Sequence, residues 1–197
     1  NLGKTVYLEE LFDNYEFLLK EKIIFSQQQL SQFDFKNMVT IALRLNKYDW
    51  TKQFISRYLS YLPEADRKNA EVYNLSRLFY STGDPRRARK LMQDVEFTDI
   101  YYHLDAKVLL VKIYYDTNAF ESLMPLLNSF GNYLKRNKKV SATQRLTYQN
   151  FLKLVLRMFN YKMFEKGNAE QINQSLEEAK QIADINWLKQ KMNELIQ

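Results

Sequence analysis

The feature that most constrains the fold is a pair of helical patterns joined by the turn Thr82-Gly83-Asp84-Pro85. The surrounding stretch, residues 74–95, reads NLSRLFYSTGDPRRARKLMQDV. Gly83 suits the left-handed conformation that closes a helix, because it has no Cβ atom. Asp84 is a good N-cap, and Pro85 fits the first turn of the next helix. The stretch therefore predicts a helix–turn–helix.

Composition extends this prediction to the whole chain. Only 4 glycines and 3 prolines occur in 197 residues, which disfavours a turn-rich all-β protein. The chain has no cysteine, so disulfides and thiolate chemistry are excluded. No apolar run approaches the roughly 18 residues of a membrane-spanning helix, and no signal-peptide pattern is present. We therefore expect a helical, cytoplasmic protein and, because the chain begins Asn1-Leu2-Gly3 instead of with Met, a fragment of a longer one.

Apolar residues at helical spacing predict an all-α fold of roughly nine or ten helices in one continuous domain over residues 1–197. Ser31 and Asp34 are alternative caps for the second helix, and Thr98-Asp99 is the expected cap of the sixth. Ser141 and Gln144 have the spacing of a capping box. The expected helices cover residues 4–24, 34–46, 50–61, 64–81, 86–95, 100–116, 120–134, 141–164, 169–183 and 186–196.

The chain also has an internal period. Trp50, Pro85 and Phe120 each begin the second helix of a pair, and they are 35 residues apart. Tetratricopeptide (TPR) repeats have a period of about 34 residues. The central unit resembles a TPR residue by residue. Leu75 and Ser76 stand at the apolar and small sites of the first helix, and Phe79 at its aromatic site. Gly83 stands at the turn site, and Ala88 at the small site where the second helix crosses the first.

The neighbouring units keep part of this pattern, namely Ala42 and Trp50 in one and Tyr114 and Phe120 in the other. The run at 95–107, with Ser129-Phe130, also looks like an uncharacterised bacterial family of TPR-like proteins. The resemblance implies a right-handed α-solenoid of antiparallel helix pairs. Its clearest repeats would span 35–62, 70–97 and 103–134, with 141–197 as a divergent repeat and C-terminal cap. The alternative is an irregular helical domain with accidental spacing.

Patterns typical of enzymes are missing. His103 is the only histidine, so a His-rich metal site cannot form, and it sits in no nucleophile motif. No glycine-rich phosphate loop is present. Carboxylate pairs such as Glu9 and Glu10 are adjacent on a helix and point about 100° apart, which indicates a solvated face. We expect no catalytic residue, no cofactor and no metal, and a non-enzymatic function.

The TPR resemblance implies that the first helix of each pair lines a concave groove. The matching residues are Tyr73, Arg77, Tyr80, Lys112 and Tyr115. The two cations are suited to a carboxylate, and the tyrosines offer rigid contact area. The expected function is a protein–protein interaction scaffold that binds a peptide segment or partner subunit, acidic in character. The alternative is that Tyr80 and Tyr115 pack between repeats and that Arg77 and Lys112 are solvated charges.

Two further alternatives follow from the charge and from the start of the chain. The formal net charge is +6, and basic groups occur at 86–90 and 135–139, which allows nucleic-acid or other polyanion binding. The second group ends a helix, where the dipole favours cations, so solvated charges also explain it. Aromatic residues are not interleaved with basic ones on one helix face, as a single-strand stacking surface requires. The other alternative is that the chain is the regulatory or oligomerising region of a larger protein.

Overall fold

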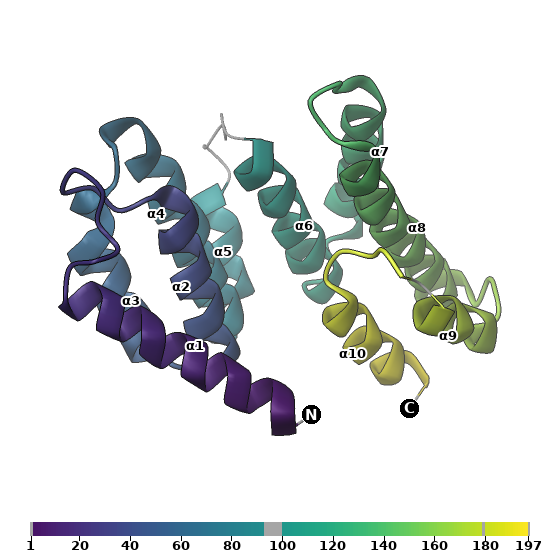
Figure 1. Ribbon diagram of the computed structural model, residues 1–197. Helices are drawn as coiled ribbons and strands as arrows, with labels where there is room; N and C mark the ends of the chain where they lie inside the picture. The colour runs from purple at the N-terminus through teal and green to yellow at the C-terminus, as the bar shows by residue number, and fades with distance from the viewer. Residues whose placement is uncertain (1, 93–99, 179, 197) are drawn as a thin grey trace. The chain divides into compact units, whose positions relative to one another are not determined.

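The computed structural model describes residues 2–92, 100–178 and 180–196, and this part of the chain is all-helical (Figure 1). The described residues form ten α-helices, one short 3-10 helix and no β-strand, which confirms the expected fold class. The helices are α1 (Leu2–Lys20), α2 (Gln32–Arg44), α3 (Tyr48–Tyr58), η1 (Leu59–Tyr61), α4 (Glu64–Ser81), α5 (Pro85–Met92), α6 (Ile100–Asp116), α7 (Phe120–Arg136), α8 (Ala142–Phe164), α9 (Ala169–Glu178) and α10 (Ile185–Ile196). The predicted cap at Thr98-Asp99 and the end of the fifth predicted helix lie outside the described residues.

The chain divides into two compact units, and the division falls within α6. Unit 1 is Asn1–Ile113 and unit 2 is Tyr114–Gln197. Helices α1 to α5 and most of α6 belong to unit 1, whereas α7 to α10 belong to unit 2. The single continuous domain and the solenoid arrangement stay predictions.

The turn between α4 and α5 has the predicted construction. Gly83 has a φ of +83°, and the next residue, Asp84, donates its backbone N–H to the carbonyl of Phe79 at 2.8 Å. The Asp84 carboxylate accepts a hydrogen bond from the Arg87 N–H at 3.0 Å, so it caps α5. Pro85 is the first residue of that helix, and Ala88 is fully buried. Interactions between residues close in the sequence therefore form this helix–turn–helix.

The same helix ending recurs before and after this turn. Asn46 and Asn118 have φ values of 55° and 53°, the left-handed conformation that Gly83 adopts. In each case the following residue donates its N–H to a carbonyl five residues back: Lys47 to Ala42 and Ala119 to Tyr114, both at 2.9 Å. Asparagine tolerates this conformation better than most residues. The three predicted repeat turns therefore share one backbone geometry, although only one contains glycine.

Several helix bounds differ from the sequence prediction. α1 ends at Lys20, not at 24, because Lys22 turns left-handed, with a φ of 58°. α9 ends at Glu178, not at 183. The following segment contacts α8 instead: Asn150 donates to the Gln181 carbonyl at 2.9 Å, and Ala183 donates to the Thr147 carbonyl at 3.3 Å. Ser31 is the cap of α2, and both hydrogen bonds of the Ser141 capping box are present.

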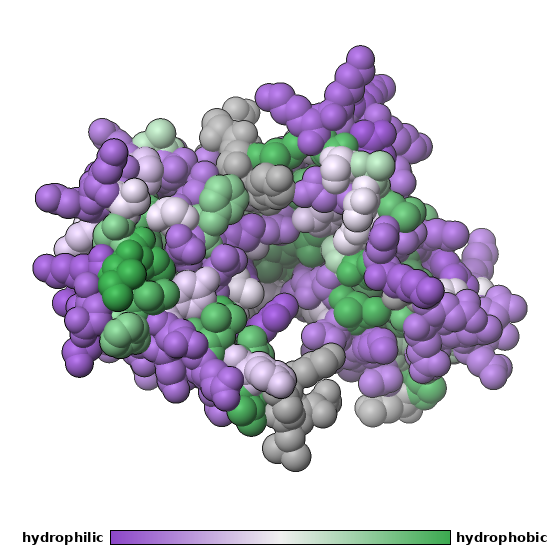
Figure 2. Space-filling view, in the orientation of Figure 1, coloured by the Kyte–Doolittle hydropathy of each residue, from purple (hydrophilic) through white to green (hydrophobic). Residues whose placement is uncertain are grey.

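Each unit has a core of fully buried aromatic and aliphatic side chains. In unit 1, Phe35 and Met38 of α2 are at most 1% exposed. In unit 2, Phe130 of α7 and Phe151 of α8 are fully buried. Outside these cores, Figure 2 shows apolar residues gathered on the surface where α1 ends. None of the described helices combines the length and apolarity needed to cross a bilayer.

Candidate functional site

The structure brings together three of the five residues predicted to line a groove. Arg77 and Tyr80 on α4 lie beside Lys112 on α6, and all three side chains are half-buried. The Lys112 ammonium lies 5.0 Å from the centre of the Tyr80 ring. Arg77 donates to the Thr40 hydroxyl of α2 at 2.7 Å. Both predicted anchor cations are therefore already held by neighbouring side chains of unit 1.

The other two predicted residues are in packed interiors. Tyr73 is 5% exposed, and its ring meets the Tyr102 ring edge-on at 5.2 Å. Tyr115 is 2% exposed and belongs to unit 2. Burial leaves little of either ring for a ligand. A peptide-binding role for the α4–α6 face stays a prediction, and it would have to use Arg77, Tyr80 and Lys112.

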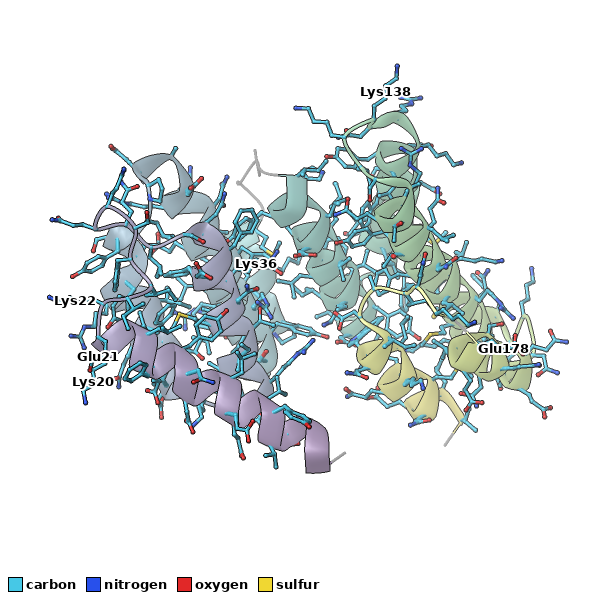
Figure 3. All side chains as sticks on the ribbon, viewed as in Figure 1. Lys20, Glu21, Lys22, Lys36, Lys138 and Glu178 are labelled. Atoms are coloured by element: carbon cyan, nitrogen blue, oxygen red, sulfur yellow. The ribbon has the colours of Figure 1, made fainter. Side chains whose placement is uncertain are left out.

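A charged residue of α2 lies behind this face. Lys36 forms an ion pair with Asp105 of α6 and lies 5.0 Å from the centre of the Tyr102 ring (Figure 3). The Lys36 side chain is 16% exposed. A cation held by a carboxylate and an aromatic face is satisfied within the fold. This arrangement joins α2 to α6 and offers little to an external ligand.

Tyr115 has an unusual environment within unit 2. Its ring packs edge-on against Trp187 at 5.4 Å, and its buried hydroxyl makes no hydrogen bond to the described residues. Burial raises the pKa of this hydroxyl well above its usual value, and the nearby charges of Asp116 and Glu194 raise it further. The folded protein therefore holds the neutral form of Tyr115.

We expect Tyr115→Phe to leave the free energy of unfolding unchanged or to raise it by about 1 kcal/mol at neutral pH, because the lost hydroxyl is buried without a partner. The raised pKa makes the wild type lose stability as pH rises above about 10, where tyrosine ionises in the unfolded chain. Tyr115→Phe removes this loss. Urea unfolding at neutral pH and at about pH 11 measures both effects. Tyr7→Phe, at a ring that is 72% exposed, is the control and should change neither value.

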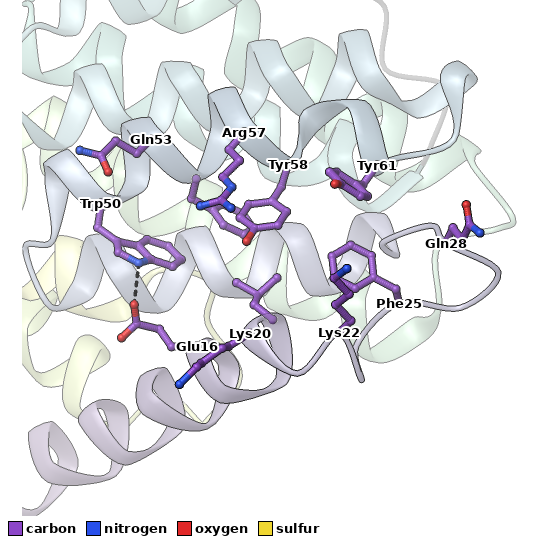
Figure 4. Close-up of a pocket in the computed structure, with 12 residues that line it drawn as sticks. Glu16, Lys20, Lys22, Phe25, Gln28, Trp50, Gln53, Arg57, Tyr58 and Tyr61 are labelled. Atoms are coloured by element: carbon purple, nitrogen blue, oxygen red, sulfur yellow. Dashed lines mark hydrogen bonds between the residues drawn. The ribbon is translucent and has the colours of Figure 1, made fainter.

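A different surface of unit 1 has the geometry of a binding site. It is a groove of about 860 Å³ between α1 and α3, closed at one end by the link that follows α1 and by η1 (Figure 4). We call it the aromatic groove. Its lining residues are Glu16, Leu19, Lys20, Lys22, Phe25, Gln28, Trp50, Gln53, Phe54, Arg57, Tyr58 and Tyr61.

A row of neighbouring aromatic rings forms one wall of the aromatic groove. Trp50, Phe54 and Tyr58 are four residues apart and therefore share one face of α3. Trp50 and Phe54 stack with ring centres 4.9 Å apart and 7° between their planes. The row continues from Phe54 to Tyr58 at 5.1 Å and from Tyr58 to Tyr61 at 5.7 Å. Trp50 and Tyr58 are half-buried, and Tyr61 is 44% exposed, so the row presents aromatic surface to solvent.

The link after α1 completes the row. Phe25 lies 5.1 Å from the Tyr61 ring. The backbone N–H of Leu30 donates to the Tyr61 carbonyl at 2.9 Å, which ties the link to η1. Gln27 and Gln28 turn left-handed there, with φ values of 49° and 64°. The local backbone therefore fixes the position of Phe25 at the end of the groove.

Positive charge surrounds these rings. Three exposed cations line the groove: Lys20, Lys22 and Arg57. The one lining carboxylate, Glu16, accepts a hydrogen bond from the Trp50 indole N–H at 2.9 Å (Figure 4). The groove thus combines an aromatic wall with a net positive rim. The cations come from α1, the link and α3 together, so a search for aromatic and basic residues interleaved on one helix face does not reveal this surface.

The remaining sequence-predicted groups are more ordinary. In the basic group at 86–90, Arg86, Arg87 and Lys90 are all exposed, and the Arg87 guanidinium lies 3.9 Å from the centre of the Phe79 ring of the same helix pair. His103 lies on α6 and is half-buried. Among the described residues, no three His, Cys, Asp or Glu side chains are placed to hold a metal ion.

The four-residue spacing of Trp50, Phe54 and Tyr58 predicts one apolar helix face but does not show what lies beside it. The spacing was visible, and so were the cations near the end of the first helix. The sequence did not show that these rings and cations line the same groove, because that depends on how α1 packs across α2 and α3. Comparison with known proteins adds no further guide, since no family model, curated protein or solved structure matches this chain.

Proposed function

We propose that this chain is a non-enzymatic protein-interaction module, and that the aromatic groove of unit 1 holds an acidic peptide segment of a partner protein. The observation that carries the proposal is the row of aromatic rings flanked by three exposed cations. Aromatic side chains give rigid contact area, and cations give electrostatic complementarity to acidic residues. We propose a TPR-like helix-pair architecture as the framework, supported by the three equivalent helix endings at Asn46, Gly83 and Asn118.

The dimensions suit a peptide. From Trp50 to Tyr58 the row advances by about 12 Å along α3, at about 1.5 Å per helical residue. An extended peptide covers about 3.3 Å per residue, so at least three or four residues lie along the rings. Side chains such as tyrosine, leucine or proline would pack on the rings, while glutamate or aspartate would face Lys20, Lys22 and Arg57. The groove lining itself contains only one carboxylate, Glu16.

Calorimetric titration with a synthetic peptide of about ten residues, built from glutamate, tyrosine and proline, tests the proposal. A matched peptide with lysine in place of glutamate is the charge control. We expect the acidic peptide to bind and the basic one not to. The double variant Lys22→Glu/Arg57→Glu should lower affinity at least tenfold, about 1.4 kcal/mol, because attraction becomes repulsion. Tyr61→Ala should also weaken binding, since it shortens the row of rings.

The control variant is Arg86→Glu/Lys90→Glu, which makes the same change in net charge at exposed positions of α5 in the same unit. It should bind the acidic peptide as the wild type does. Equal losses in the two double variants would show a general charge effect and would refute the groove. If Arg77→Gln/Lys112→Gln alone abolished binding, the α4–α6 face would be the site instead.

A further inference from the structure

After Glu121 in the first turn of α7, the hairpin of α7 and α8 in unit 2 carries charge of one sign only. Residues 122–164 contain eight lysines and arginines and no aspartate or glutamate. The eight are Lys135, Arg136, Lys138, Lys139, Arg145, Lys153, Arg157 and Lys162. Over the whole chain, 29 basic residues accompany 23 acidic ones, so this stretch departs strongly from the average. Its charges are not balanced by acidic neighbours in the sequence.

The loop between the two helices, residues 137–141, has a fixed backbone. The Arg145 guanidinium donates to the carbonyls of Asn137 and Val140 at 3.3 and 3.2 Å. The Asn137 side chain accepts the Lys139 N–H at 2.9 Å. Val140 is 2% exposed, so it anchors the loop in the core. The loop is therefore an ordered turn, held by these hydrogen bonds and by the buried Val140 side chain.

Four cations project from this ordered turn and from the end of α7. Lys135, Arg136, Lys138 and Lys139 are all exposed, and none forms an ion pair with a carboxylate of the described residues. Figure 3 shows the Lys138 side chain pointing away from the fold at the tip of the hairpin. Figure 2 shows hydrophilic residues covering the same tip. We call this surface the basic tip.

The helix dipole explains only part of the basic tip. Lys135 and Arg136 lie in the last turn of α7, where the negative end of the dipole favours cations. Lys138 and Lys139 follow after the helix has ended, beyond that stabilisation. Four like charges on a short, rigid segment repel one another and cost stability. An anionic ligand would remove this cost.

We propose that the basic tip binds the phosphate backbone of nucleic acid without reading its sequence. This is a second activity, in unit 2, and it goes beyond the peptide-binding function proposed for unit 1. Lysine and arginine contacts to phosphates release counterions and need no apolar contact. Duplex DNA carries one phosphate charge per about 1.7 Å of helix axis, or about 3.4 Å along each strand, so several cations on one turn contact neighbouring phosphates.

The composition of the tip argues against two other anionic partners, an acidic protein and a lipid surface. Protein–protein interfaces are depleted in lysine at their centre and enriched in aromatic residues. The only apolar residue of the loop, Val140, is buried, so the tip has no apolar side chain to present to a protein or to insert between lipids. Binding to a phosphate backbone requires only cations, and the tip presents four of them.

The test is a fluorescence-anisotropy titration of the whole chain with a labelled DNA duplex of about 20 base pairs and arbitrary sequence, at about 50 to 200 mM salt. We expect micromolar to sub-millimolar binding that weakens steeply with salt, with a slope of log K against log salt of about −3 to −4 for four phosphate contacts. Lys138→Glu/Lys139→Glu should lower affinity at least tenfold and reduce the slope by about 2. These positions are exposed loop residues, so the melting temperature should stay the same.

Lys52→Glu/Lys68→Glu is the matched control, because it changes the net charge equally at exposed positions of α3 and α4. It should bind the duplex like the wild type. The proposal is overturned if the wild type does not bind, if binding does not depend on salt, or if both double variants lose affinity equally. It is also overturned if vesicles containing phosphatidylserine bind and the duplex does not. The groove variant Lys22→Glu/Arg57→Glu is expected to leave duplex binding intact, which separates this site from the peptide groove.

Discussion

Replacing Phe35 with alanine is expected to lower the free energy of unfolding of unit 1 by about 3–5 kcal/mol, because it leaves a cavity under the aromatic groove. Phe35 is fully buried on α2, and its ring lies 4.9 Å from that of Phe54. Phe54 in turn stacks on Trp50 in the wall of the groove. Removal of the Phe35 ring therefore deprives the row of its support, and we expect affinity for the acidic peptide to fall as well.

Urea unfolding followed by circular dichroism measures the loss, and hydrogen exchange of the α2 and α3 amides locates it in unit 1. Phe33→Ala is the matched control, because it removes the same side chain from the same helix at a position that is 49% exposed. It should cost less than about 1 kcal/mol. Equal costs for the two variants would mean that Phe35 does not support the core in the way described.

The second large effect is expected at Trp187 in unit 2. Trp187 of α10 is 5% exposed and packs against Tyr115 at 5.4 Å and Phe151 at 6.0 Å. Its indole N–H donates to the Asp116 carboxylate at 3.4 Å. We expect Trp187→Ala to cost about 3–5 kcal/mol and to increase hydrogen exchange in α10 first. Ile196→Ala, on the same helix and 55% exposed, should have little effect.

A second contact also holds α10, so Trp187→Ala is expected to loosen the helix and not to detach it completely. Lys191 forms an ion pair with Asp116 at 3.0 Å. Burial opposes the charged form of Lys191, but hydrogen bonds to Glu194 and Asp116 outweigh it and raise the pKa of Lys191. Because this pKa is raised, the stabilisation is fully present below the ordinary lysine pKa of about 10.4 and is lost as pH rises further. Exchange in α10 that equals the wild type after Trp187→Ala would contradict the role given to the indole.

Much of the fold was predictable because its signals are local. Helix α4 begins at Glu64 and ends at Ser81, and α6 spans Ile100–Asp116, both as the periodicity predicted. The caps at Ser31, Asp84 and Ser141 were also visible in the sequence, since each depends on residues at most three positions apart. The predicted helix ends were wrong where a tertiary contact replaced a helical hydrogen bond. After α9, for example, the Gln181 carbonyl accepts a hydrogen bond from Asn150 of α8.

The candidate sites were predicted less well, for two different reasons. Arg77, Tyr80 and Lys112 do lie together, but the sequence did not show that Thr40 and neighbouring rings already hold the two cations. The aromatic groove needs Lys20 and Tyr58, which are far apart in the chain, to line the same cavity. The basic tip was present in the sequence as an acid-free stretch. Its exposure and rigidity became clear only from the loop that Arg145 holds.

The sequence by itself determined the helix–turn–helix at Gly83-Asp84-Pro85, the all-helical class and the excess of positive charge. These follow from backbone preferences, apolar periodicity and composition, which act over a few residues or need no structure at all. The tertiary structure alone decided that Tyr73 and Tyr115 are buried while Trp50, Tyr58 and Tyr61 face a groove beside cations. The physical reason is that burial depends on which helix packs against which face, and a single amphipathic pattern leaves that choice open.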